Sequence, residues 1–177
     1  MARDLHVLPE FIGNRSPYAD PETRAVVAGL DLDTDIAAME RLFVAGLCGL
    51  AYGLAEVIEA FAAHGVLSRI MIMGGGASRS PLVRQIMADT TGLTVALPQT
   101  REPVLLGAAM LGAVAGGAYA SIGETMAKMS ALGRLNEPTA PGMAAFHGRK
   151  REVYRLLREV DRGSRAAMRG LDMDLPR

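Results

Sequence analysis

The chain has 177 residues, half of them hydrophobic, with 19 basic and 19 acidic side chains and a formal net charge of zero. This length suits a single domain over residues 1–177, with an aliphatic core because aromatic residues are few and tryptophan is absent. The neutral balance argues against nucleic acid or an anionic membrane as partner. The single cysteine excludes an internal disulfide and favours a reducing cytoplasm. No stretch is expected to span a bilayer, and residues 1–4 do not begin a signal peptide.

The first 35 residues are expected to hold a loop, one strand and a helix start. Three prolines and a Gly-Asn pair make residues 1–23 an ordered loop, and a short strand follows at Ala25–Ala28. Three alternating aspartates then invite a calcium-loop interpretation, which fails because the sixth-place glycine and the bidentate glutamate are absent. They are Asp31, Asp33 and Asp35. We interpret them as carboxylates at a helix start, with Thr34 as the N-cap.

A long helix is predicted from Thr34 to Gly65, because apolar residues recur there in steps of three and four. The stripe expected to face the core is Ile36, Met39, Phe43, Leu47, Leu50, Leu54, Val57 and Phe61. Gly46, Gly49 and Gly53 interrupt this helix, each at a cost of about 1 kcal/mol relative to alanine. We therefore expect another backbone to pack closely against it. Cys48 is interpreted as a small buried thiol, because no histidine lies near it in sequence.

A strand, a glycine turn and a helix are predicted between Arg69 and Gly92. The apolar run Ile70–Met73 is typical of a strand buried on both faces, and it stops at Gly74-Gly75-Gly76-Ala77. Ser80 is a favourable N-cap, Pro81 a favourable first helical residue and Gly92 a favourable C′ residue. The apolar face of this helix is expected at Leu82, Val83, Ile86 and Met87. The turn matches neither a Walker loop nor a G-x-G-x-x-G fingerprint, so it indicates either a structural turn or a nucleotide seat.

The rest of the chain is predicted to be mainly helical. A second buried strand at residues 93–98 precedes a helix from Pro103 to about Gly116, whose small residues permit close packing. A capping box begins a short helix at Ser121 that ends near Ala131, and residues 134–142 are expected to be a loop. Residues 146–169 are predicted to form a surface helix with a narrow apolar stripe of Val153, Leu156, Leu157 and Val160. Its charges favour a solvated face over a basic patch. The three histidines share no ligand spacing, so no metal site is expected, and no catalytic triad can be proposed from sequence order.

Several stretches resemble one family. The order strand, long helix, strand, helix, strand, helix is similar to the second part of a ribonuclease-H-like unit. The stretches His6–Phe11, Gly13–Pro17, Ala88–Gly92 and Glu102–Ala109 resemble the C-terminal domain of the FGGY carbohydrate kinases. Gly13-Asn14-Arg15-Ser16-Pro17 is most similar to the D-ribulokinase-like branch. The resemblance implies a partial α/β ribonuclease-H-like (actin-like ATPase) fold: residues 1–30 an opening loop and strand, 31–117 the core and 118–177 the C-terminal helices.

The resemblance also implies an activity and a site. Gly74-Gly75-Gly76-Ala77 stands where the family keeps its adenosine motif. The resemblance implies that Gly75, Gly76 and Ala77 line the adenine and ribose with backbone, with Ser80 facing the adenine and Arg79 over the nucleotide. ATP and Mg²⁺ are the implied cofactors, and the reaction is phosphoryl transfer to a carbohydrate hydroxyl. The sugar would be bound by an N-terminal domain. The family's catalytic aspartate and phosphate motifs lie upstream of this sequence, so no catalytic residue is assigned and the chain alone is expected to be inactive.

Two hypotheses follow: the ATP-binding half of a pentulose kinase, or a non-catalytic actin-like binding or dimerisation module. In a ribonuclease-H-like unit, two antiparallel strands precede the strand at Ala25–Ala28, and both are expected to be missing here. One of them would lie beside Ile70–Met73. An open apolar edge there predicts a homo-oligomer, or an edge covered by the chain's own N-terminal segment.

Overall fold

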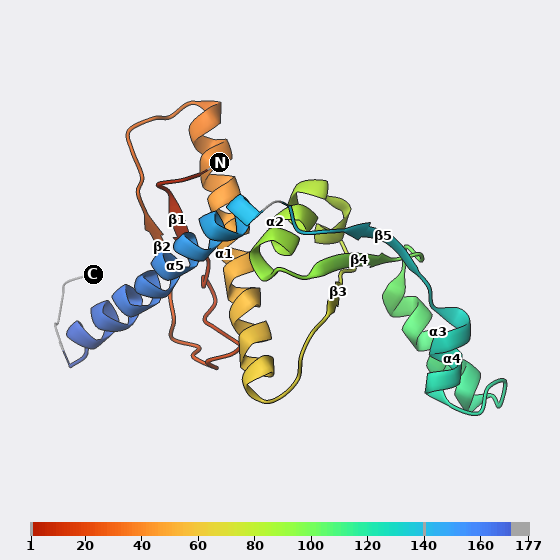
Figure 1. Ribbon diagram of the computed structural model, residues 1–177. Helices are drawn as coiled ribbons and strands as arrows, with labels where there is room; N and C mark the ends of the chain where they lie inside the picture. Colours follow the sequence, from red (N-terminus) through yellow and green to blue (C-terminus); the bar gives the residue numbers. More distant parts are fainter. Residues whose placement is uncertain (1, 140, 171–177) are drawn as a thin grey trace. The chain divides into compact units, whose positions relative to one another are not determined.

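The computed structural model describes residues 2–139 and 141–170, and their contacts divide the chain into two compact units (Figure 1). One unit comprises residues 1–64 and 145–177, the other residues 65–144. The first holds β1 (His6–Leu8), β2 (Val26–Ala28), α1 (Ile36–Ala63) and most of α5 (Pro141–Ala167). The second holds β3 (Ile70–Ile72), a 3-10 turn (Ala77–Arg79), α2 (Pro81–Thr91), β4 (Thr94–Pro98), α3 (Pro103–Ala115), α4 (Ile122–Met129) and β5 (Leu132–Asn136). That the two units make one domain stays a prediction.

The first unit contains a strand that the sequence did not predict. β1 pairs antiparallel with β2, with Leu8 opposite Val26 and His6 opposite Ala28. The prediction of loop throughout residues 1–23 is therefore wrong at His6–Leu8. The expectation that both strands preceding β2 are missing is also wrong, because β1 is one antiparallel neighbour of β2. A three-residue strand is too short to show the alternation by which strands are recognised.

α1 begins one residue later than expected. Asp35, not Thr34, is the N-cap, and its carboxylate accepts a 2.7 Å hydrogen bond from the Ala38 N–H. The close packing expected at the glycines is confirmed at Gly49, where an added Cβ would lie 2.3 Å from the Val7 carbonyl oxygen. β1 thus approaches α1 so closely at Gly49 that only glycine, which has no Cβ, fits there.

The face of α1 that is buried is not the predicted one. Ile36, Phe43 and Leu50 are all more than half exposed, whereas the buried residues are mostly small: Ala45, Cys48, Gly49, Ala51, Tyr52, Ala55 and Glu56. The prediction took size as the sign of burial, but close approach of β1 selects small side chains. By length and hydropathy alone, α1 is long and apolar enough to cross a membrane. This corrects the expectation that no stretch of the chain could span a bilayer. Glu56 and Glu59 of this helix nevertheless form ion pairs with α5, as in a helix packed against protein.

α5 buries a charged face, which also corrects the prediction. Leu156 and Val160 are exposed, whereas the buried residues are His147, Lys150, Tyr154, Leu157, Arg158 and Asp161. Their partners come from elements far away in sequence, which a helical pattern does not reveal. The Lys150 ammonium donates to the carbonyl oxygens of Ala2, Arg3 and Leu5.

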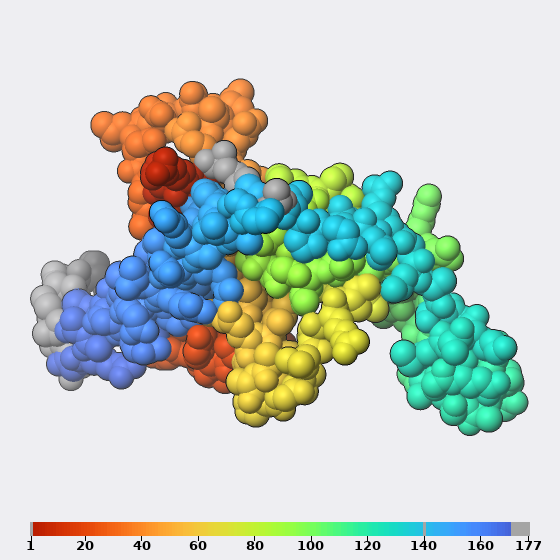
Figure 2. Space-filling model, in the orientation of Figure 1, coloured from red at the N-terminus to blue at the C-terminus, as the bar shows by residue number. Residues whose placement is uncertain are grey.

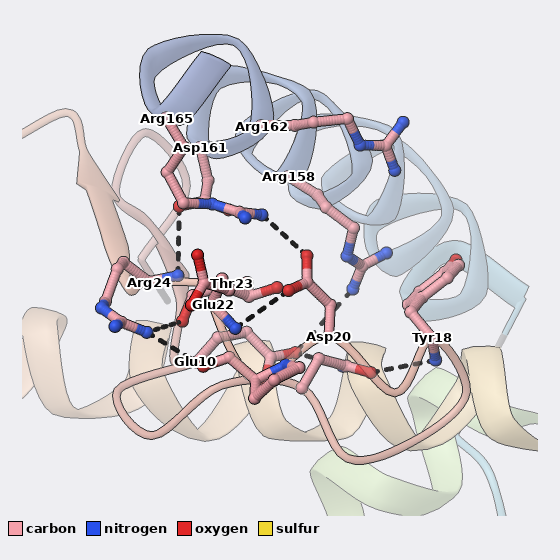
Figure 3. Close-up of polar contacts among 12 residues, drawn as sticks. Glu10, Tyr18, Asp20, Glu22, Thr23, Arg24, Arg158, Asp161, Arg162 and Arg165 are labelled. Carbon is pink, nitrogen blue, oxygen red and sulfur yellow. Dashed lines mark hydrogen bonds and ion pairs between the residues drawn. The ribbon is translucent and has the colours of Figure 1, made fainter. Parts of the chain in front are cut away.

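The segment between β1 and β2 is tied to α5 by ion pairs (Figure 3). The Arg165 guanidinium lies 2.8 Å from Asp20 and 2.9 Å from Asp161. Asp161 also accepts a hydrogen bond from the Arg24 backbone N–H at 3.1 Å. The Cζ atom of Arg158 lies over the Tyr18 ring, 4.3 Å from its centroid. These contacts fix Tyr18, Asp20 and Arg24 of this segment against α5.

The second unit is built on a three-stranded sheet in the order β3-β4-β5. β3 runs parallel to β4, and β5 runs antiparallel to β4. Val95 and Ala96 of the central β4 are fully buried, but Ile72 of β3 is 61% exposed. The expectation that this strand is buried on both faces is therefore wrong, because β4 is its one neighbour among the described residues. β5 occupies a segment expected to be helix end and loop.

α3 and α4 pack against each other, and α4 forms part of the rounded teal lobe in Figure 2. α3 begins at Pro103 and ends at Ala115 with Gly116 as its C-cap, close to the predicted end. The expected packing of α3 on a neighbouring helix is found, but not through Gly107 or Gly112, where an added Cβ would meet nothing within 4 Å. α4 ends at Met129, two residues before the predicted end.

Candidate nucleotide site

The glycine turn connects the end of β3 to the start of α2. Gly75 has φ +81°, a conformation that favours glycine, and the Ser78 hydroxyl donates a 2.7 Å hydrogen bond to its carbonyl oxygen. An added Cβ at Gly74 would lie 2.9 Å from the Pro103 ring, so this glycine lets the start of α3 approach. Among the described residues, no hydrogen bond engages the N–H groups of Gly74, Gly75 or Gly76. The turn therefore offers backbone donors to a ligand, as its composition predicts.

The predicted caps of α2 are confirmed. The Ser80 hydroxyl accepts a 3.4 Å hydrogen bond from the Val83 N–H, Pro81 is the first helical residue and Gly92 closes the helix with φ +70°. Val83 and Ile86 are buried as expected, but Leu82 is exposed. Because the Ser80 hydroxyl already serves the helix, it has less capacity to recognise a base.

An open pocket of about 700 Å³ lies at the carboxyl ends of the parallel strands β3 and β4. Its lining is Met73, Gly74, Gly75, Ser78, Arg79, Arg84, Leu97, Pro98, Gln99, Thr100, Arg101, Pro103 and Arg134. Three of the six residues assigned to ATP line this pocket: Gly74, Gly75 and Arg79. The other three, Gly76, Ala77 and Ser80, adjoin them in the chain but are not part of the lining. Crevices beyond the carboxyl ends of parallel strands are where α/β proteins bind ligands.

The pocket is basic, which sequence reasoning missed. Among the residues that the structure describes, four arginines line it and no acidic residue does. Arg84 is 3% exposed, and its guanidinium donates to the Asn136 side-chain oxygen at 2.8 Å and the Ser78 carbonyl at 2.6 Å. In the sequence, the position of Arg84 between Val83 and Ile86 on the predicted apolar face of the helix is the one sign that its side chain is buried. Arg101 and Arg134 come from separate elements, so no sequence spacing connects them.

Asp89 holds α2 to the segment after β5. It is buried, and its Oδ1 accepts hydrogen bonds from the Thr139 N–H at 2.6 Å and the Thr139 hydroxyl at 2.8 Å. Gln85 donates to the same oxygen at 3.1 Å. Asp89 belongs to the Ala88–Gly92 stretch that carries the family resemblance, and here it acts as a structural anchor.

The lining residues do not fit a metal ion. The pocket has no carboxylate, and residues 2–139 and 141–170 contain no group of three or more His, Cys, Asp or Glu side chains suited to a metal. Mg²⁺ prefers oxygen ligands, so we derive no step through it. Cys48 lies elsewhere and is buried as predicted; burial raises the pKa of its thiol, which a hydrogen bond from Tyr52 opposes.

Solved structures of sugar kinases share this fold. Xylulose kinase from Lactobacillus acidophilus is 22% identical and superposes with a TM-score of 0.76 over 90% of this chain and 31% of its own. Glycerol kinase from Plasmodium falciparum, solved with ADP, is 18% identical with a TM-score of 0.66 over 97% of this chain and 32% of its own. The chain therefore has the α/β actin-like ATPase fold, in part, as predicted.

The sequence comparisons identify the family. Residues 1–116 match the model for the C-terminal domain of the FGGY family of carbohydrate kinases, so the chain belongs to this family. A human FGGY carbohydrate kinase domain-containing protein is 42% identical over 151 residues, 85% of this chain and 27% of that protein. A D-ribulokinase from Saccharomyces cerevisiae is 31% identical over 116 residues, 65% of this chain and 16% of that protein. The chain thus spans about a quarter or less of the length of these relatives.

Proposed function

We propose that this chain forms the ATP-binding part of a kinase that transfers the γ-phosphoryl group of ATP to a carbohydrate hydroxyl. The observation that carries the proposal is the turn at Gly74–Gly76. Its free N–H groups lie between a parallel strand and a helix N-terminus, beside a pocket of nucleotide-compatible size.

The chain's own residues would bind and orient the nucleotide. Backbone N–H groups of the turn would donate to it, and the arginines would offset phosphate charge. Bound ATP would supply the transferable phosphoryl group. In the described part of the chain, the pocket lining holds no carboxylate that could serve as a general base, so deprotonation of the sugar hydroxyl falls to another part of a complete kinase. We therefore expect the chain alone to bind nucleotide but not to phosphorylate sugar.

The sugar class proposed is a pentulose such as D-ribulose. Support comes from the Gly13–Pro17 segment and from the D-ribulokinase among the relatives. The same proposal assigns the chain to the cytoplasm, with the sugar bound by an N-terminal domain and without nucleic acid or membrane as partner.

Calorimetric titration with ATP tests the proposal, using two matched glycine variants. Gly75 and Gly117 both have positive φ, +81° and +73°, and a Cβ added at either would meet nothing within 4 Å. Gly75→Ala and Gly117→Ala therefore impose similar backbone strain, but only Gly75 lines the pocket. We expect Gly75→Ala alone to weaken ATP binding. Equal affinities in both variants and the wild type would contradict the proposed seat.

A second candidate function is a non-catalytic binding or dimerisation module. The exposed apolar edge strand β3 favours it, because an unpaired edge can accept another strand. A measurement of ATP binding separates the two candidate functions, because a module that serves only for association does not require an ATP-binding site.

A further inference from the structure

The four arginines of the pocket come from four different places in the chain. Arg79 lies in the 3-10 turn, Arg84 on α2, Arg101 after β4 and Arg134 on β5. The chain as a whole has a formal net charge of zero, so this gathering of positive charge is local. Within residues 2–139 and 141–170, no aspartate or glutamate lines the same pocket to balance this charge.

Arg84 is the most informative of the four. It is buried, yet its hydrogen-bond partners, Asn136 and the Ser78 carbonyl, are both neutral. Within the described ranges, no ion pair includes Arg84. Arg158, which is buried to a similar degree, lies 2.7 Å from the Glu56 carboxylate. A buried charge is unfavourable unless an opposite charge compensates it. An anion bound in the pocket would compensate the positive charge of the Arg84 guanidinium.

The other three arginines are exposed. In the part of the chain that the structure describes, their side chains make no hydrogen bond or ion pair. They are therefore available to a ligand without first breaking an internal contact. Guanidinium groups bind both carboxylate and phosphate through paired N–H donors. Several guanidinium groups in one pocket favour a ligand that carries several negative charges, such as a polyphosphate.

We propose that Arg101 and Arg134, backed by the buried charge of Arg84, bind the polyphosphate group of the nucleotide and set its affinity by phosphate charge more than by base. This inference rests on the proposed function, because it assigns the ligand's polyphosphate to the same pocket. The Ser80 hydroxyl, which the resemblance places at the adenine, already accepts from the Val83 N–H and is not part of the pocket lining. Affinity should therefore rise from adenosine through AMP and ADP to ATP, and GTP should bind nearly as well as ATP.

Titrations with ATP, adenosine and inorganic tripolyphosphate test this, using Arg101→Ala/Arg134→Ala and the control Arg69→Ala. Arg69 is an exposed arginine of the same unit outside the pocket, so its removal changes net charge but not the site. We expect the double variant to bind ATP and tripolyphosphate at least about tenfold more weakly, the control to bind normally, and adenosine affinity not to change. Circular dichroism verifies that the exposed substitutions leave the fold intact.

The outcomes separate the two claims. Wild-type ATP affinity in the double variant, together with adenosine binding, would overturn the arginine assignment and leave the nucleotide seat standing. If the wild-type chain binds tripolyphosphate as tightly as ATP and the double variant loses this binding, the arginines bind phosphate without a contribution from the nucleoside. This result would support the arginine pocket and remove the proposed nucleotide function. Binding of neither ATP nor tripolyphosphate to the wild-type chain would overturn both.

Discussion

The Arg158 guanidinium lies 2.7 Å from the Glu56 carboxylate, and both side chains are almost completely buried. Arg158 comes from α5 and Glu56 from α1, so this pair joins two helices that are far apart in sequence. The Glu10 carboxylate lies 3.9 Å from the same guanidinium, which adds the segment after β1 to the contact. Burial opposes the charge of Arg158, but Glu56 more than compensates and raises the pKa of the guanidinium.

The first prediction is that Arg158→Ala strongly destabilises the first unit. Removing one partner of a buried ion pair leaves the other charge uncompensated, at a cost of about 3–5 kcal/mol. Urea denaturation should show this loss, whereas Arg149→Ala, at an exposed position of the same helix, should change the free energy of unfolding by less than about 0.5 kcal/mol. Similar stabilities in the two variants would show that the pair contributes little.

The second prediction concerns two glycines of α1. A Cβ at Gly49 would lie 2.3 Å from the Val7 carbonyl oxygen, whereas one at Gly46 would meet nothing within 4 Å. Gly49→Ala should therefore lower the melting temperature by forcing β1 away from α1. Gly46→Ala should raise it, because alanine favours a helix by about 1 kcal/mol over glycine. The opposite order of melting temperatures would contradict the described packing of β1 on α1.

The third prediction is a pH dependence at His6. Burial lowers the pKa of its imidazole below the usual 6.5, Lys150 lowers it further and Asp4 opposes both. The folded state thus favours neutral His6, so this contribution to stability is complete above pH 6.5 and is lost as the pH falls through the folded pKa. NMR titration should give a midpoint below 6.5, and His6→Gln should reduce the loss of stability between about pH 7 and about pH 5. A midpoint above 6.5 would contradict this prediction, because protonation of His6 would then stabilise the folded state.

The fourth prediction follows from the exposed edge of β3. We expect the chain to form a dimer or larger species at micromolar concentration, through pairing at this edge. Ile72→Lys, which places a charge on the edge strand, should shift the sedimentation profile toward monomer. Leu156→Lys, at a similarly exposed apolar position on α5, should not. A wild-type chain that sediments as a monomer would remove the association proposal.

The sequence predicted best what is determined locally. Ser80, Pro81 and Gly92 bound α2 because a cap acts on the backbone within a few residues of itself. The family assignment was also correct, since it rested on short contiguous stretches. β1 and β5 were missed because pairing with distant strands, not their own pattern, makes them strands. The buried faces of α1 and α5 were misassigned for a similar reason: β1 selects small residues on one, and distant carboxylates and carbonyl groups allow charged residues on the other. Arg101 and Arg134 line the same pocket as Gly75 only because the fold brings separate elements together, so their grouping could not be predicted from sequence spacing.

The most direct test of the nucleotide seat is to map amide chemical shifts on addition of ATP. We predict that the amide resonances of Gly74, Gly75 and Arg79 shift with a common dissociation constant, and that those of the first unit, such as Gly49, do not. The same shifts should weaken in Gly75→Ala and persist in Gly117→Ala. ATP-dependent shifts confined to residues outside the pocket, or no shifts at millimolar ATP, would contradict the assignment of this turn as the nucleotide site.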